Sequence, residues 1–222
     1  MNSKRGAFVT LEGPDGSGKT THFGFICEAL RERGYRVVET RQPGGSPTAE
    51  VIRQAVLGTE LNEPMDPVTE AMLYAASRRQ VLKSVIEPNL AMGAIIVSDR
   101  WADSSFAYQG FGRGIMQEFL AIRDIAHKDF WPDVTMYFDV TLEESLQRMA
   151  NRKKAFNRLN NEELEFRKRC FNGYSGLISG DVSERMVIVD AERSIAEIQQ
   201  SIHRYLDGEF AEKFGHLRHY PR

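Results

Sequence analysis

Near its amino end the chain reads Gly13-Pro14-Asp15-Gly16-Ser17-Gly18-Lys19-Thr20. This run fits the pattern G-x-x-x-x-G-K-[ST], which binds the phosphates of a nucleoside triphosphate. The sequence around it predicts a short apolar strand at residues 7–11 and an amphipathic helix at residues 21–33. A strand, a glycine loop and a helix N-terminus together form an anion site, because the helix dipole adds positive charge there. We therefore predict a phosphate-binding loop at residues 13–20.

The residues of this loop have distinct expected roles. Lys19 is expected to reach the β- and γ-phosphates, and the Thr20 hydroxyl is expected to hold Mg²⁺. A chance glycine turn is the alternative, but the full pattern lies between the right elements. The residues predicted to bind ATP are Gly13, Asp15, Gly16, Ser17, Gly18, Lys19, Thr20 and Thr21.

The composition of the 222-residue chain is that of an ordinary globular protein, with 41% hydrophobic and 27% charged residues. A net charge of −2 argues against a general nucleic-acid or membrane-surface binder. No apolar run approaches the ~20 residues of a membrane span, and the residues before the first strand leave no room for a signal peptide. Cys27 and Cys170 are isolated in sequence, so we expect a reducing, cytoplasmic location. Cys27 falls on the apolar face of the first helix and is expected in the core.

Predicted strands and helices alternate along the chain, without an internal repeat. The expected strands are 7–11, 36–40, 94–97, 134–140 and 186–189. The expected helices are 21–33, 48–57, 67–90, 116–128, 142–152, 162–178 and 194–205, with Pro88 bending or ending the third and a glycine-rich turn at 110–114. This order predicts a three-layer α/β/α fold with a mainly five-stranded parallel sheet. Ligands then bind at the carboxyl ends of the strands.

Asp99 and Arg100 follow an apolar strand directly and are expected to point into that crevice. Asp99 is predicted to orient Mg²⁺ or its waters, and Arg100 to hold an acceptor phosphate, because a guanidinium binds phosphate through two hydrogen bonds. The alternative is a structural ion pair, which fits Asp99 better than Arg100. For Arg41 and Arg53, taken alone, a solvated surface position is favoured.

Two classes of nucleotide enzyme remain open at this point. A switch or motor hydrolyses its nucleotide with water, whereas a kinase passes the phosphoryl group to a second substrate. The chain lacks the N-K-x-D pattern of a guanine-reading switch. A polar, basic segment at 151–161 contains Arg152 and Arg158. It reads either as a lid that brings cations over the migrating phosphoryl group or as a solvated loop.

Several spaced motifs resemble the thymidylate kinases. The matching stretches are Phe8 to Thr21, Thr40 to Gly45, Glu70 to Arg78, Asp99 to Gly110 and Pro132 to Val140. The resemblance extends from about Gly6 to Tyr205. It implies a P-loop kinase that transfers the γ-phosphoryl group of ATP to dTMP with Mg²⁺. It also implies a homodimer, a single kinase domain at 1–206 with a lid at about 151–161, and a tail at 207–222 without an assigned role.

The resemblance implies roles for individual side chains. Asp15 would meet the sugar 3′-hydroxyl, and Tyr108 would crowd the 2′ position. Arg53 and Arg100 would hold the dTMP phosphate, and Tyr74 would stack on the thymine. The remaining acceptor-binding residues would be Gln42, Arg78, Ser104, Ser105 and Gln109, of which Arg78, Ser105 and Gln109 would read polar edges of the base.

The resemblance also assigns the catalytic cations, and the chain departs from the family pattern in places. The catalytic residues would be Lys19, Asp99, Arg100, Arg152 and Arg158. Because Gly16-Ser17 brings no arginine into the loop, the lid would supply the cation, with Arg158 the best candidate. Gln42 replaces the usual glutamate, and Tyr74 replaces a phenylalanine. These departures leave room for another 5-substituted dUMP, such as 5-hydroxymethyl-dUMP, as acceptor. A nucleotide switch or sensor is the less favoured alternative.

Overall fold

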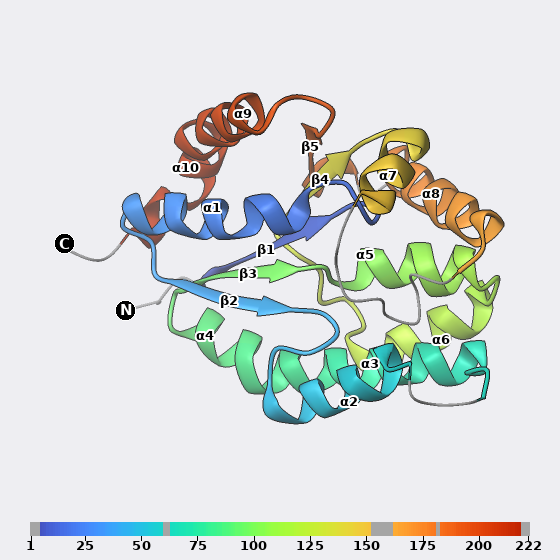
Figure 1. Cartoon of the computed structure of the whole chain (residues 1–222). Helices are drawn as coiled ribbons and strands as arrows, with labels where there is room; N and C mark the ends of the chain where they lie inside the picture. The colour runs from blue at the N-terminus through green and yellow to red at the C-terminus, as the bar shows by residue number, and fades with distance from the viewer. Residues whose placement is uncertain (1–4, 60–62, 152–161, 181–182, 219–222) are drawn as a thin grey trace.

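The computed structural model describes residues 5–59, 63–151, 162–180 and 183–218. Its centre is a five-stranded sheet in the order β2-β3-β1-β4-β5 (Figure 1). All four neighbouring pairs are parallel, as the alternating pattern predicted. The strands are β1 (Ala7–Glu12), β2 (Val37–Arg41), β3 (Ile95–Asp99), β4 (Val134–Asp139) and β5 (Met186–Asp190).

Helices cover both faces of the sheet (Figure 1). On one side lie α1 (Lys19–Glu32), α9 (Ile195–Asp207) and α10 (Glu209–Phe214). On the other side lie α2 (Pro47–Leu57), α3 (Pro67–Val81), α4 (Glu87–Ala91), α5 (Ala102–Ser105) and α6 (Met116–Ala126). The remaining helices are α7 (Leu142–Ala150) and α8 (Leu164–Ile178). The predicted P-loop α/β fold class is therefore confirmed.

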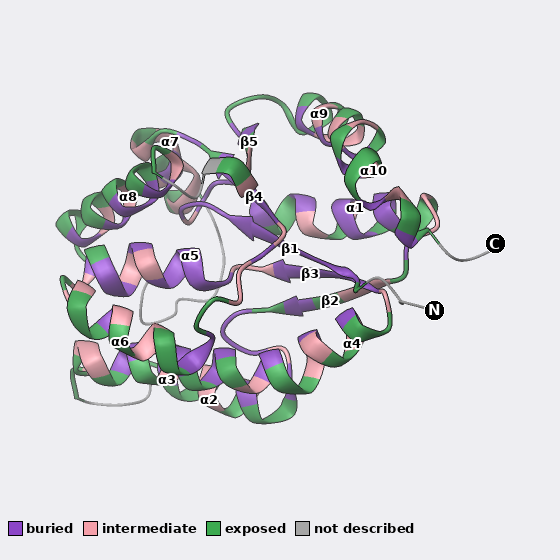
Figure 2. Ribbon diagram, turned by 180° about the vertical axis from the view of Figure 1, so that it is seen from behind, coloured by how far each residue is buried: buried purple, intermediate pink, exposed green. Residues whose placement is uncertain are grey.

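The alternation of side chains along β1 explains why two cores form. Val9 and Leu11 pack in the cluster that contains α1 and α9, whereas Phe8 packs in the cluster that contains the end of α3 and α4. Successive side chains of a strand point to opposite faces. Figure 2 shows the result, with the central strands buried on both sides. Thr10 and Glu12 follow Phe8 on the same face of β1, and both are fully buried.

Two predicted segments differ in detail from the structure. The long helix predicted at 67–90 is interrupted by a π-helical turn at Leu82–Ile86, and Pro88 lies in the first turn of α4. A proline is tolerated there because the first N–H groups of a helix have no partner within it. The predicted glycine-rich turn at 110–114 begins inside a second π-helical segment, Phe106–Gly112, where Gly110 and Gly112 are buried.

Residues 207–218 are folded against the sheet domain. Phe210, Phe214 and Leu217 belong to the same apolar cluster as α1 and β1. The Phe210 ring is fully buried and lies edge-on to Tyr35, with ring centroids 5.7 Å apart. His216 is exposed, and Cys27 is fully buried in the core, as expected. The predicted tail therefore contributes to the core of the kinase domain.

This packing makes Phe210→Ala strongly destabilising. We expect the free energy of unfolding to fall by about 3–5 kcal/mol, because a buried phenylalanine leaves a cavity when truncated. Ile195→Ala is the matched control, since Ile195 is 56% exposed, and it should change stability by less than about 0.5 kcal/mol. Urea unfolding measures both values. Equal, small effects of the two substitutions would show that the segment is not part of the core.

Candidate functional site

The phosphate loop packs tightly against the end of β4. Gly13 has a φ of 138°, and a Cβ at this position would lie 2.7 Å from the Phe138 carbonyl oxygen. A Cβ at Gly16, where φ is 86°, would lie 2.5 Å from the carbonyl oxygen of Ser145 in α7. Only glycine accommodates both the positive φ and the close approach. The loop is thereby held open for phosphate between β1 and α1.

Lys19 is bonded to the loop itself. Its Nζ donates to the carbonyl oxygens of Gly13 and Pro14, each at 2.8 Å, and to Ser17 Oγ at 3.2 Å. Burial and the nearby Arg100 lower the pKa of Lys19 to about 7, although neighbouring carboxylates oppose the shift. The anionic oxygens of a bound phosphate would favour the charged form of Lys19 instead.

Arg100 stands between the phosphate loop and the predicted acceptor side. Its Nη1 donates to the Gly13 carbonyl at 3.1 Å and to Ser104 Oγ at 2.9 Å, and its Nη2 donates to Asp15 at 2.5 Å. Its backbone φ is 72°, an uncommon value for a residue other than glycine. Such local strain concentrates at functional sites. The structure thus brings Arg100, Asp15 and Ser104 together, as predicted.

Asp15 is held as a carboxylate. Burial acts to raise its pKa, but Arg100 and Lys19 outweigh this and lower the pKa below the ordinary value. A hydrogen bond from Tyr108 adds to the effect. Tyr108 also lies beneath Arg100, with the guanidinium carbon 5.3 Å from the centroid of the ring. Asp15 can therefore accept a hydrogen bond from a sugar hydroxyl while it neutralises Arg100.

Glu12 is a residue whose role the sequence reasoning missed. This fully buried side chain accepts hydrogen bonds through Oε1 from the backbone N–H groups of Trp101 at 2.7 Å and Ser104 at 3.3 Å. Its Oε2 accepts from Ser104 Oγ at 2.6 Å and from the Tyr174 hydroxyl at 3.1 Å. The one signal in the sequence was that Glu12 is a single acidic residue at the end of an apolar strand. Tyr174, in α8, gave no signal in the sequence.

The residues expected to meet the acceptor base form a second group. Arg78 is buried and donates through Nε to Gln42 Oε1 at 3.0 Å and through Nη2 to Ser105 Oγ. Gln42 Nε2 donates to the backbone carbonyl of Tyr74 at 3.0 Å. Gln109 lies apart from this chain of contacts and donates to Glu70 at 2.8 Å. The structure thus brings Gln42, Tyr74, Arg78 and Ser105 together, whereas Gln109 is bound by a carboxylate that the prediction did not include.

The remaining arginines differ in their surroundings. Arg41 forms an exposed ion pair with Glu50 at 2.8 Å, in keeping with a solvated position. Arg53 is partly buried and donates to the carbonyl oxygen of Pro43 at 2.7 Å. Arg152 and Arg158, the predicted lid cations, lie outside the described residues.

Thr20 and Thr21 are exposed at the start of α1. Asp99 is partly exposed at the end of β3 and acts electrostatically on Lys19. Among the residues that the structure describes, no group of three or more His, Cys, Asp or Glu side chains is arranged to hold a metal.

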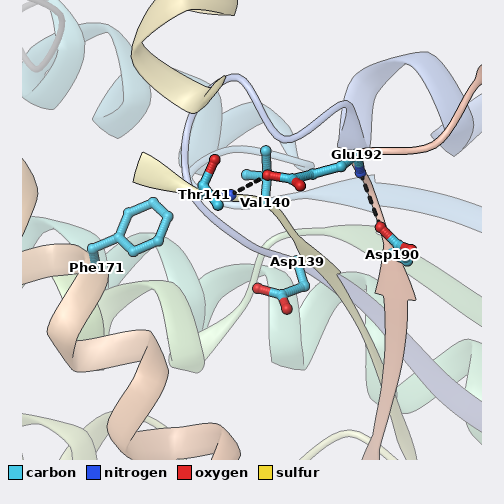
Figure 3. Close-up of a pocket in the computed structure, with 6 residues that line it drawn as sticks. All are labelled: Asp139, Val140, Thr141, Phe171, Asp190 and Glu192. Atoms are coloured by element: carbon cyan, nitrogen blue, oxygen red, sulfur yellow. Dashed lines mark hydrogen bonds between the residues drawn. The ribbon is translucent and has the colours of Figure 1, made fainter. Parts of the chain in front are cut away.

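A pocket of about 290 Å³ opens at the carboxyl ends of β4 and β5, beside the phosphate loop (Figure 3). Its lining residues are Asp139, Val140, Thr141, Phe171, Asp190 and Glu192. The backbone N–H of Thr141 donates to Glu192 at 3.0 Å, and this hydrogen bond joins two residues of the pocket lining. Burial, together with Asp190 and Glu192, raises the pKa of Asp139. Sequence reasoning did not identify this pocket.

Comparison of the sequence with known proteins identifies its family. The family model described as thymidylate kinase matches residues 11–202. The chain belongs to the thymidylate kinase family. A thymidylate kinase of Shouchella clausii is 46% identical over 197 residues, which cover 88% of this chain and 92% of the relative. A thymidylate kinase of Bacillus pumilus is 42% identical, with 90% and 95% covered. That of Caldanaerobacter subterraneus is 36% identical, with 92% and 98% covered.

Membership of the thymidylate kinase family confirms the resemblance and the prediction of a kinase. The matches lend no support to another acceptor or to a switch. None of the described helices is both long and apolar enough to span a bilayer. The roles of single side chains stay predictions, because family membership does not test them.

The buried Glu12 predicts a pH-dependent stability. Burial and Asp103 raise its pKa from 4.5 to about 7, against Arg100 and the hydrogen bonds to Ser104 and Trp101. The folded protein therefore holds this proton more tightly than the unfolded chain. The stability that results is complete below pH 4.5 and is lost as the pH rises through about 7.

We expect Glu12→Gln to remove this titration. Between pH 4.5 and about 7, the free energy of unfolding of the variant should rise relative to that of the original protein, by up to about 1.4 kcal/mol per pH unit. Above that range the difference should level off. Lost hydrogen bonds add an offset that does not depend on pH. Urea unfolding over the pH range measures the difference, with the exposed Glu118→Gln as control. A constant difference at all pH values would contradict the raised pKa.

Proposed function

We propose that this chain transfers the γ-phosphoryl group of ATP to the phosphate of dTMP, giving ADP and dTDP, with Mg²⁺. The observation that carries the proposal is the position of Arg100. Its guanidinium bonds both to the phosphate loop, at Gly13 and Asp15, and to Ser104 in α5, which is among the residues predicted to meet the acceptor. One cation thus adjoins donor and acceptor, which phosphoryl transfer needs for the charge on the migrating group.

On the donor side, the triphosphate binds to the N–H groups of the phosphate loop and the start of α1. Lys19 exchanges its carbonyl partners for the β- and γ-phosphates. The pocket at Asp139 and Thr141 receives the adenine, whose amino group donates to the acidic lining. Mg²⁺ is held by the Thr20 hydroxyl and by Asp99, directly or through water. It supplies charge neutralisation to the phosphate oxygens when bound.

On the acceptor side, Arg100 and Arg53 hold the dTMP phosphate. Asp15 accepts the sugar 3′-hydroxyl, and Tyr108 fills the space of a 2′-hydroxyl. Tyr74 stacks on the thymine, which adds ~0.5–1.5 kcal/mol beyond the buried area. The base edge meets Arg78, Ser105 and Gln109. Gln42 lies behind Arg78, and Ser104 lies beside Arg100.

The lid completes the proposal. Gly16-Ser17 places no cation in the loop itself, so we assign the further cation to Arg158 or Arg152. A lid that closes would also keep water from acting as the acceptor. We place the enzyme in the cytoplasm, which agrees with two cysteines that are both buried and free.

Removal of Arg100 tests the proposal most directly. We expect Arg100→Ala to lower dTMP phosphorylation by about a thousandfold or more, while ATP binding, measured by calorimetry, survives. Arg36→Ala is the control, because Arg36 is exposed before β2. The same assay with dTMP, dUMP, 5-hydroxymethyl-dUMP, dCMP and dGMP identifies the acceptor. Normal turnover of dTMP by Arg100→Ala would refute the site. ATP hydrolysis at a rate that none of the acceptors changes would favour a switch.

A homodimer is the proposed assembly. The helices α2, α3 and α6 form one layer, and exposed apolar side chains lie on each of them: Val51, Met72 and Ile125, with 65%, 56% and 82% of their surface exposed. A second copy of this chain would cover them.

Ile125→Asp should therefore shift the protein from dimer to monomer in sedimentation equilibrium, because dimerisation would bury an unpaired charge. Ile195→Asp is the control, since Ile195 is exposed on α9, in the layer that covers the other face of the sheet. An unmodified protein that sediments as a monomer would remove this part of the proposal.

A further inference from the structure

Gln42 lies at the centre of the predicted base site and is 4% exposed. Both ends of its amide are used. Oε1 accepts from Arg78 Nε at 3.0 Å, and Nε2 donates to the Tyr74 carbonyl oxygen at 3.0 Å. The backbone N–H of Gln42 donates to the Asp99 carbonyl at 3.0 Å, which fixes the loop to the end of β3. The orientation of the amide is therefore determined: the oxygen faces Arg78.

Arg78 is a buried cation whose direct partners are all neutral. Its side chain is 1% exposed and contacts Gln42, Ser105 Oγ and the face of Trp101, whose ring centroid is 5.8 Å from the guanidinium carbon. Within the described part of the chain, no carboxylate forms an ion pair with Arg78, and its Nη1 donates no hydrogen bond. Burial lowers the pKa of Arg78 to about 10, so the group stays charged at neutral pH.

The charged and titratable groups around Arg78 do not neutralise it by contact. Glu12 and Asp103 act on it only through space, as does Tyr74. His127 stays uncharged, because burial and Arg78 lower its pKa to about 3. A buried charge without a paired opposite charge is costly. It therefore favours a ligand that brings negative charge to this position.

We propose that Gln42 is a specificity-determining residue that keeps Arg78 uncompensated, so that the site selects pyrimidines with an oxygen or an ionised imide at the base edge. The inference rests on the proposed function, in which Arg78 faces the acceptor base. Arginine has only donors, so it attracts a 4-oxo group or the anion left when N3 loses its proton. A 4-amino group, which is itself a donor, is rejected.

A glutamate at position 42 would reverse this arrangement. Its carboxylate would pair with Arg78 and neutralise it, and it has no N–H to donate to the Tyr74 carbonyl. The base would then meet an ion pair instead of a free cation, and charge-assisted hydrogen bonds are roughly twice as strong as neutral ones. The identity of residue 42 thus sets the strength of the interaction between Arg78 and the base.

The test compares dTMP with 5-bromo-dUMP and dCMP. Bromine withdraws electrons and makes the N3–H more acidic, so 5-bromo-dUMP carries more of the imide anion at alkaline pH. We expect the KM of the original protein for 5-bromo-dUMP, relative to dTMP, to fall as the pH rises from slightly acid to slightly alkaline. dCMP should be a very poor acceptor under all conditions.

In Gln42→Glu this pH-dependent preference should disappear, with a loss of about tenfold in the KM ratio, equivalent to ~1.4 kcal/mol. Gln200→Glu adds the same charge at an exposed position of α9 and should leave the preference intact. Gln42→Met is the second variant. It loses both hydrogen bonds but adds no charge, so it should raise all KM values together and keep the preference.

The outcomes separate charge from geometry. If Gln42→Met loses the preference as Gln42→Glu does, position 42 acts only through shape, and the inference is overturned. It is also overturned if the original protein shows no change of the KM ratio with pH. Failure of the original protein to phosphorylate dTMP would instead refute the proposed function. Thermal melting identifies a variant that does not fold. In that case the pH dependence of the KM ratio in the original protein still decides the question.

Discussion

The carboxylate of Glu12 joins the two halves of the site. It belongs to the strand that leads into the phosphate loop, and it accepts the backbone N–H groups of Trp101 and Ser104 beyond β3. Those bonds fix the turn in which Arg100 adopts its left-handed backbone conformation. The guanidinium then returns to the phosphate loop at Gly13. One buried acid therefore helps to set the distance between the phosphate loop and the Arg100 guanidinium.

The two cations beside the phosphate loop, Lys19 and Arg100, are bonded to other groups of the protein. Lys19 bonds to backbone carbonyls of the loop, and Arg100 bonds to Asp15. A substrate phosphate thus competes with existing contacts instead of filling a vacant cation site. For Lys19 the exchange would favour phosphate, because an ammonium group attracts an anionic oxygen more strongly than a neutral carbonyl oxygen. Binding of both substrates would accordingly rearrange the hydrogen bonds of Lys19 and Arg100.

The sequence predicted the sheet and the phosphate loop well, because strand patterning and the glycine motif depend on local physics. It did not predict Glu12 or Tyr174, whose contact joins positions 162 residues apart. The π-helical turn at Leu82–Ile86 carries no distinct periodicity in the sequence. The tail at 207–222 had no assigned role, yet its Phe210 and Phe214 belong to the core. Such features depend on tertiary packing, which single-residue patterns do not encode.

Two arginines of the predicted acceptor site, Arg100 and Arg78, differ in the charge of their partners. Where the phosphate would bind, Arg100 already has the carboxylate of Asp15 as partner, so an incoming phosphate enters a balanced network and specificity there rests on geometry. Where the base would bind, Arg78 has only neutral partners, so selectivity rests on the charge that the ligand brings. Gln42 matters for this reason: its amide orients the guanidinium without cancelling it. An arginine that is oriented but not neutralised can distinguish an oxygen from an amine through electrostatics, and shape alone does so poorly because the two groups are similar in size.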